Sequence, residues 1–167
     1  LMAVGGRIGA PVAAAATHAL AEPDEVTARL AAAVRLHARL AAAAYRVVRG
    51  AGALALPPQA GRHLYVDLEP LRPALAARGV DDAQDLEDLL TGRLGTVVPG
   101  GHRFGDDLAA LRVRLSTGPL LGAAPEQRAA ALAADDPLTA PQVSVGLTHL
   151  ASVFGELHDE TRQCADR

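Results

Sequence analysis

Hydrophobic and polar residues alternate strictly over residues 111–116, a pattern that predicts a strand with one buried and one open face. The apolar residues are Leu111, Val113 and Leu115. The polar residues between them are Arg112, Arg114 and Ser116. Two guanidinium groups on one face are suited to bind a carboxylate or a phosphate, because each offers a planar fork of N–H donors. The alternative is that both arginines are surface residues or partners of structural acids.

Three further strands are predicted at residues 53–56, 62–68 and 96–98. The second of them alternates like residues 111–116, so its leucine and valine side chains face the core. His63, Tyr65 and Asp67 then share its open face. The third strand leads directly into a glycine-rich bend at residues 98–105.

Helical periodicity is strongest over residues 23–50, where Pro23 and neighbouring acids mark the start and Gly50 is a natural C-cap. Shorter helices are predicted at 69–77, 83–93, 125–134 and 141–161. In the helix at 83–93 we expect Asp85, Glu87 and Asp88 to form a solvated face rather than a metal site. The order of strands and helices predicts an α+β fold with helices on one face of a small sheet.

Composition narrows the function classes. Hydrophobic residues make up 50% of the 167 residues, but aromatic residues only 2%, so the core must consist of Leu, Val and Ala. The net charge of −3 argues against a nucleic-acid-binding protein, because such proteins usually carry a basic surface. No apolar run is long enough for a membrane span, and Cys164 is the only cysteine, so we expect a cytoplasmic protein without disulfides or a cysteine-based metal cluster. Every basic residue is an arginine, so no lysine can form a Schiff base.

Several single residues have two interpretations. Arg7 lies between Gly6 and Gly9, which would let an anion approach the backbone closely. His37 lies on the apolar side of the long helix and is more simply a packed histidine than a ligand. His102 and Arg103, in the bend, either help to select a substrate side chain or serve the loop alone.

Four stretches follow one another in a specific order. They are Gly5-Gly6-Arg7-Ile8-Gly9, the long helix from Pro23, Pro58 with residues 61–68, and residues 99–105 followed by Arg114-Leu115-Ser116. Together they resemble the C-terminal part of a fold-type-I aminotransferase, a pyridoxal-phosphate-dependent enzyme of the class I/II family. The resemblance covers about residues 1–160.

The resemblance implies a division of the chain. Residues 1–22 would be a remnant of the large cofactor-binding domain, and residues 23–50 would be the interdomain helix. Residues 51–160 would be the small C-terminal domain, and residues 161–167 a tail. The full-length enzyme would be a homodimer without nucleic-acid or membrane partners.

The resemblance also implies roles. Arg7 would contact the phosphate of pyridoxal 5′-phosphate, and Arg114 would bind the α-carboxylate of amino acid and 2-oxo acid substrates. Arg112 is the second candidate, because only Arg114 directly precedes the Leu-Ser pair. His63 and Tyr65 would line the small-domain side of the pocket or have structural roles. The reaction would be transfer of an amino group between an amino acid and a 2-oxo acid.

In this family the Schiff-base lysine would lie roughly eight residues before the phosphate arginine, hence just ahead of Leu1. The chain alone is therefore expected to be inactive. The alternative to an aminotransferase fragment is a non-catalytic remnant or interaction domain whose arginine strand is structural or binds another anion. A phosphate- or nucleotide-binding module built on the glycine bend is less well supported, because no Gly-x-x-x-x-Gly-Lys motif is present.

Overall fold

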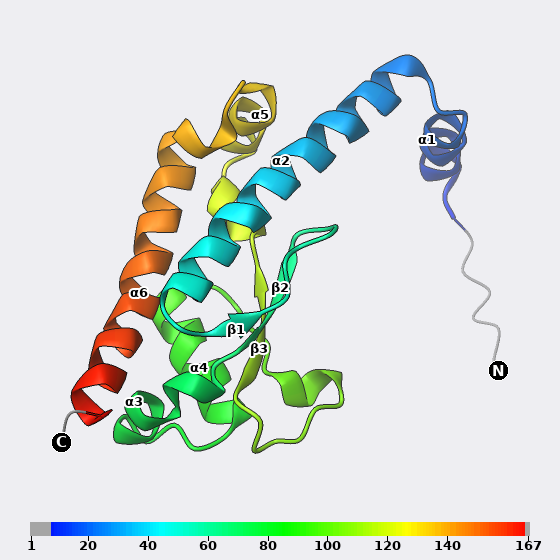
Figure 1. The fold of residues 1–167 in the computed structure, drawn as a ribbon. Coiled ribbons are helices and arrows are strands. Elements are labelled where there is room, and N and C mark those ends of the chain that lie inside the picture. The colour runs from blue at the N-terminus through cyan, green and yellow to red at the C-terminus, as the bar shows by residue number, and fades with distance from the viewer. Residues whose placement is uncertain (1–7, 166–167) are drawn as a thin grey trace, which may run out of the picture.

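A computed structural model describes residues 8–165, which form six α-helices, four short 3-10 helices and a three-stranded sheet (Figure 1). The helices are α1 (Ala10–Leu20), α2 (Asp24–Gly50), α3 (Arg72–Ala77), α4 (Ala83–Leu94), α5 (Pro125–Ala133) and α6 (Pro141–Ala165). The strands are β1 (Leu54–Ala55), β2 (His63–Asp67) and β3 (Arg112–Ser116). The fold is therefore α+β, as the sequence predicts.

The sheet is antiparallel throughout and has the order β1-β2-β3. Strands β2 and β3 pair so that Tyr65 lies opposite Arg114 and Asp67 lies opposite Arg112. Their leucine and valine side chains are buried, whereas the polar residues between them are exposed or half-buried. The alternation predicted for both strands is confirmed, and it leaves one sheet face open.

The apolar sheet face packs into the main hydrophobic core together with residues of α2, α3, α4 and α6. Phe154 of α6 is fully buried there and is the largest of the buried side chains. A smaller core lies nearer the N-terminal end of α2, where Leu36 and Leu40 meet α5 and α6. Burial of the apolar side chains in these two cores is the main stabilising contribution to folding, and it holds the sheet against the helices.

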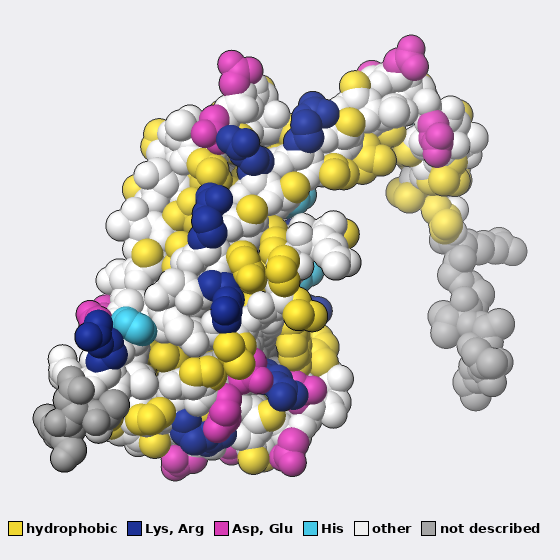
Figure 2. Space-filling view, in the orientation of Figure 1, with side chains coloured by type: hydrophobic (Ala, Val, Ile, Leu, Met, Phe, Trp, Pro, Cys, Tyr) yellow, Lys and Arg dark blue, Asp and Glu magenta, His cyan; other side chains and the backbone are white. Residues whose placement is uncertain are grey.

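Helix α1 and the first half of α2 extend away from this body (Figure 1). None of the residues of α1 is buried, and the hydrophobic side chains of Val12, Leu20, Leu30 and Val34 are exposed. Figure 2 shows hydrophobic side chains gathered on α1 and along the underside of the projecting half of α2. In the part of the chain that the structure describes, no helix has both the length and the apolar character needed to cross a membrane.

Two expectations differ from the observed elements. Residues 96–98 form no strand, although Arg114 donates its backbone N–H to the carbonyl of Pro99 and Gly100 makes an isolated bridge to Val113. The segment runs beside β3, but Pro99 has no N–H to continue a ladder. No helix is predicted before residue 23, yet residues 10–20 form α1, because consecutive alanines favour a helix.

Candidate functional site

The candidate site is the open face of the sheet, which the bend over residues 98–105 partly covers. The bend contains a short 3-10 helix, Gly101–Phe104, that ends at Gly105 with a positive φ of 94°. A side chain at Gly101 would meet the Tyr65 hydroxyl at 2.8 Å, so only glycine lets the bend lie this close to β2. The bend therefore brings Phe104 over the polar residues of β2 and β3.

Glu87 of α4 holds the bend in place. Its carboxylate accepts a hydrogen bond from the Gly100 backbone N–H at 2.8 Å and two from Arg103, both at 2.6 Å. The expectation that Glu87 belongs to a solvated face is wrong, since the residue is only 7% exposed. Ala83 and Leu90, one turn before and after it on the helix, are buried, and this spacing is the signal that could have revealed its burial.

The pKa of the Glu87 carboxyl is lowered, chiefly by the hydrogen bonds from Arg103 and against the effect of burial, which raises it. A lowered pKa in the folded state means that the ionised form stabilises the fold above the ordinary value of about 4.5, and that this stabilisation disappears as the pH falls below it. We therefore expect the stability difference between the wild type and Glu87→Gln to be constant from pH 7 to pH 5. In this range the Glu87 carboxyl is ionised in both the folded and the unfolded wild type.

Below that range the difference should shrink, because protonated Glu87 and glutamine are alike in charge. Urea unfolding of both proteins at a series of pH values measures it. Comparing the two proteins removes the contributions of Glu69, Glu156 and Glu160, whose pKa values are also lowered by arginine partners. A difference that grew towards acid pH would contradict the assigned role of the ion pair.

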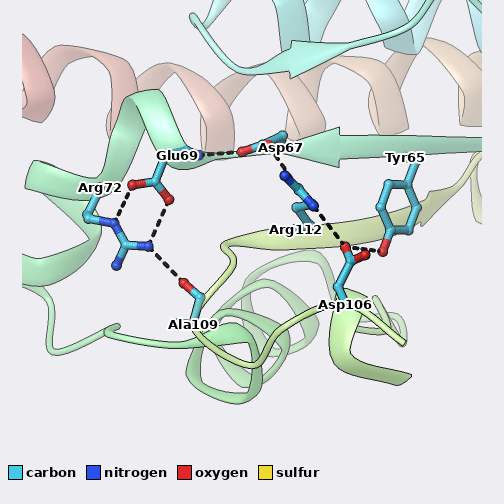
Figure 3. A network of polar contacts seen from close by, with 7 residues as sticks. All are labelled: Tyr65, Asp67, Glu69, Arg72, Asp106, Ala109 and Arg112. Atoms are coloured by element: carbon cyan, nitrogen blue, oxygen red, sulfur yellow. Dashed lines mark hydrogen bonds and ion pairs between the residues drawn. The ribbon is translucent and has the colours of Figure 1, made fainter. Parts of the chain in front are cut away.

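Arg112 is occupied by two carboxylates (Figure 3). Its Nε donates to Asp67 at 2.9 Å, and its Nη1 lies 3.5 Å from Asp106. Tyr65 donates its hydroxyl to the same Asp106 at 2.8 Å, and burial together with this hydrogen bond raises the pKa of Tyr65. The guanidinium of Arg112 thus links β3 to Asp67 of β2 and to Asp106, the residue that follows the bend.

Arg114 has a different environment on the same face. Its guanidinium carbon lies 4.4 Å from the centroid of the Phe104 ring, a cation–π arrangement. Phe104 in turn meets Tyr65 edge-on, with ring centroids 6.3 Å apart. Within residues 8–165, Arg114 forms no ion pair, and its buried Nε has no hydrogen-bond partner. It is a fixed cation whose donors remain available for an anion.

A histidine and a second arginine lie close to Arg114. His63 lies near Arg114 and Arg62, and burial followed by these two charges lowers the pKa of His63. A hollow of about 820 Å³ adjoins the face, and its wall includes His63, Tyr65 and Arg112. The hollow gives small molecules access to the polar side of β2, where a neutral imidazole can hydrogen-bond in either direction.

The structure separates the predicted site residues. Arg112 and Arg114 lie on one face, but only Arg114 is without a carboxylate partner among the described residues. Arg103 is held by Glu87 and so has the loop role, while the buried Nδ1 of His102 finds no partner in the described part of the chain. Arg7 lies outside the described residues. Sequence reasoning gave Phe104 and Asp106 no site role: Phe104 entered only as part of the bend over residues 99–105, and Asp106 belongs to no recognisable motif.

The residues of this chain do not form a covalent pyridoxal-phosphate site. The sequence contains no lysine, and Arg7 is not among the described residues. Nor, among residues 8–165, does any group of three His, Cys, Asp or Glu side chains form a candidate metal site. What the described residues do provide is a positioned guanidinium beside two aromatic rings. The chain matches none of the known protein families, curated proteins or solved structures with which it was compared.

Proposed function

We propose that this chain is the C-terminal part of a fold-type-I pyridoxal-phosphate-dependent aminotransferase, in which Arg114 binds the α-carboxylate of the amino acid or 2-oxo acid. The observation that carries the proposal is the contrast between the two arginines of β3. Arg112 has two carboxylate partners, whereas Arg114 has none among residues 8–165. A guanidinium that is already oriented loses little conformational entropy when it binds a carboxylate in a bidentate manner.

The neighbours of Arg114 support a small-molecule site. Phe104 fixes one face of the guanidinium, which directs its N–H donors to the edge, where a planar carboxylate binds. Because Asp67 and Asp106 are held by Arg112, their negative charges do not compete for Arg114. The Arg114 guanidinium can orient a carboxylate ligand but does not itself transfer protons, because arginine stays protonated in proteins.

In this proposal the Schiff-base lysine that holds the cofactor lies outside residues 1–167. The substrates are amino acids and 2-oxo acids. Residues 51–160 are the small domain, α2 is the helix that joins it to the large domain, and the whole enzyme is a cytoplasmic homodimer. The α+β architecture, the long helix and the exposed apolar side chains of α1 and α2 support such an arrangement. In this proposal the chain contributes recognition of the substrate carboxylate, and the cofactor supplies the electron-withdrawing chemistry of the reaction.

The proposal is tested on the chain itself by titration with pyruvate, with methyl pyruvate as the matched ligand without a carboxylate. We expect pyruvate to shift the ring resonances of Phe104 and Tyr65 in a saturable manner, and methyl pyruvate to leave them unchanged. Phe104 and Phe154 are the only phenylalanines, so the signals are readily assigned. Equal shifts with both ligands would contradict carboxylate binding at Arg114.

A second observation separates an aminotransferase from a carboxylate-binding domain of another kind. The genomic DNA immediately 5′ of the Leu1 codon should encode, in frame, a lysine roughly eight residues before Arg7. Binding of pyruvate without such a lysine would support the non-catalytic alternative.

A further inference from the structure

A second hollow, of about 620 Å³, lies between the middle of α2, the start of β2, the end of β3 and the turn before α5. Its charged or titratable wall residues are Arg62, Arg128 and His37, which come from three separate segments of the chain. No carboxylate is among the described residues that line it. Two arginines without a counter-charge are unusual in a protein whose net charge is −3.

The polar groups of this hollow have unused hydrogen-bonding capacity. Arg62 forms no side-chain hydrogen bond or ion pair with the residues that the structure describes, and its Nη1 is directed to Gly118, 3.8 Å from the position a Cβ would take there. Arg128 donates its Nε to the carbonyl of Gly122 at 3.1 Å, which fixes the guanidinium and leaves its terminal nitrogens free. Ser116 accepts from the Gly118 N–H at 3.3 Å and can still donate its hydroxyl hydrogen.

His37 supplies an independent indication. Its Nδ1 is buried and has no partner among residues 8–165, although buried ring nitrogens normally make a hydrogen bond. Burial, and then the charge of Arg62, lower the pKa of His37, so Arg62 lies close enough for its charge to act on the imidazole. The interpretation of His37 as a packed histidine therefore leaves this atom unexplained.

We propose that this hollow binds a phosphate group, either as inorganic phosphate or as the phosphate of a small monoester. Its donors are the guanidinium groups of Arg62 and Arg128, the hydroxyl of Ser116 and the imidazole of His37. Two positive charges match the charge of a phosphate, which is about −1.5 to −2 at neutral pH, better than that of one carboxylate. Donors from several directions also suit a tetrahedral anion, since a carboxylate presents only two oxygens in one plane.

The site is distinct from the carboxylate site at Arg114, and Arg114 is not part of its wall. Glycines at 118 and 122 keep the turn open beside the arginines, and Gly122 has a positive φ of 82° that a larger residue would rarely adopt. The volume exceeds that of phosphate alone, so a monoester such as glycerol 3-phosphate should bind more tightly than inorganic phosphate.

The experiment is a titration of the intact chain with inorganic phosphate and with glycerol 3-phosphate, at constant ionic strength set with chloride. We expect saturable shifts of the His37 and Ser116 resonances, with a dissociation constant below about 10 mM. Arg62→Gln should weaken binding about tenfold, the loss of one charge-assisted hydrogen bond, and Arg128→Gln similarly. Arg46→Gln makes the same charge change at an exposed residue of α2 outside the hollow and should leave the affinity unchanged.

Three outcomes would overturn the proposal. The first is the absence of saturation up to about 100 mM of either ligand. The second is an equal loss in Arg46→Gln, which would indicate general attraction to a positive surface. The third is a response at Phe104 without one at His37, which would assign phosphate to the Arg114 site. Tighter binding of glycerol 3-phosphate identifies a monoester as the ligand, and equal affinity identifies inorganic phosphate.

Discussion

Glu87→Ala is expected to lower the free energy of unfolding by about 2–3 kcal/mol, because it removes the only acceptor that the buried Gly100 N–H has in the described structure. Most of the loss comes from that unpaired donor and from the missing packing of a side chain that is 7% exposed. The ion pair itself adds less, since Arg103 is about half exposed, at 51%. Urea denaturation at neutral pH measures the change.

Two variants show which part of Glu87 matters. Glu87→Gln keeps an acceptor for Gly100 but loses the charge, so it should cost about 1 kcal/mol. Asp88→Ala, at the next residue of α4, removes an exposed carboxylate bound only to Gln84, and should change stability by less than about 0.5 kcal/mol. If Glu87→Ala were as stable as Asp88→Ala, the bend would have to be anchored by other contacts.

Arg114→Gln is expected to weaken pyruvate binding about 100-fold, the cost of removing one partner of a charge-assisted, bidentate contact. The fold should lose no more than about 1 kcal/mol of stability, because Arg114 gives up its cation–π contact with Phe104 but has no ion pair among residues 8–165 to lose. Arg114→Lys keeps the charge but not the planar fork and should lose about tenfold. Isothermal titration calorimetry measures the affinities.

Three further readouts establish that Arg114 acts directly. Since the charge of Arg114 lowers the pKa of His63, Arg114→Gln should raise it, which an NMR titration follows. Arg46→Gln is the matched control and should bind pyruvate like the wild type. Arg112→Gln should reduce stability, because it breaks contacts to Asp67 and Asp106. Loss of binding in Arg112→Gln with an unchanged fold would assign the carboxylate to Arg112 instead.

The fold could be predicted where a pattern is local. Alternation identifies β2 and β3, and the period of apolar residues identifies α2 almost to its last residue. Prediction fails at residues 96–98, where β-branched residues favour a strand but Pro99 interrupts the hydrogen-bond ladder. Helix α1 was missed because its nearly uniform run of apolar residues shows no helical period; the helix propensity of its alanines decides the conformation of residues 10–20.

The candidate site could be predicted only in part. Alternation puts Arg112 and Arg114 on the same face, but their different roles depend on which residue of β2 lies opposite each. That register comes from long-range pairing and from Asp106, directly after the bend, neither of which a local pattern contains. The ion pair of Glu87 could not be predicted for the same reason, since its partner Arg103 is 16 residues away and outside the helix, although the spacing from Ala83 and Leu90 indicates that Glu87 is buried.

The pairing of β2 with β3 also affects how the protein folds. Asp67 and Arg112 are 45 residues apart in the sequence, and both α3 and α4 lie between them. Closing so long a loop costs entropy before any contact compensates for it, and contacts of this kind slow folding. Helices can form early, but the placement of Arg114 opposite Tyr65 requires the completed sheet. The carboxylate site that we propose at Arg114 would therefore form only at the end of folding, and an incompletely folded chain would lack it.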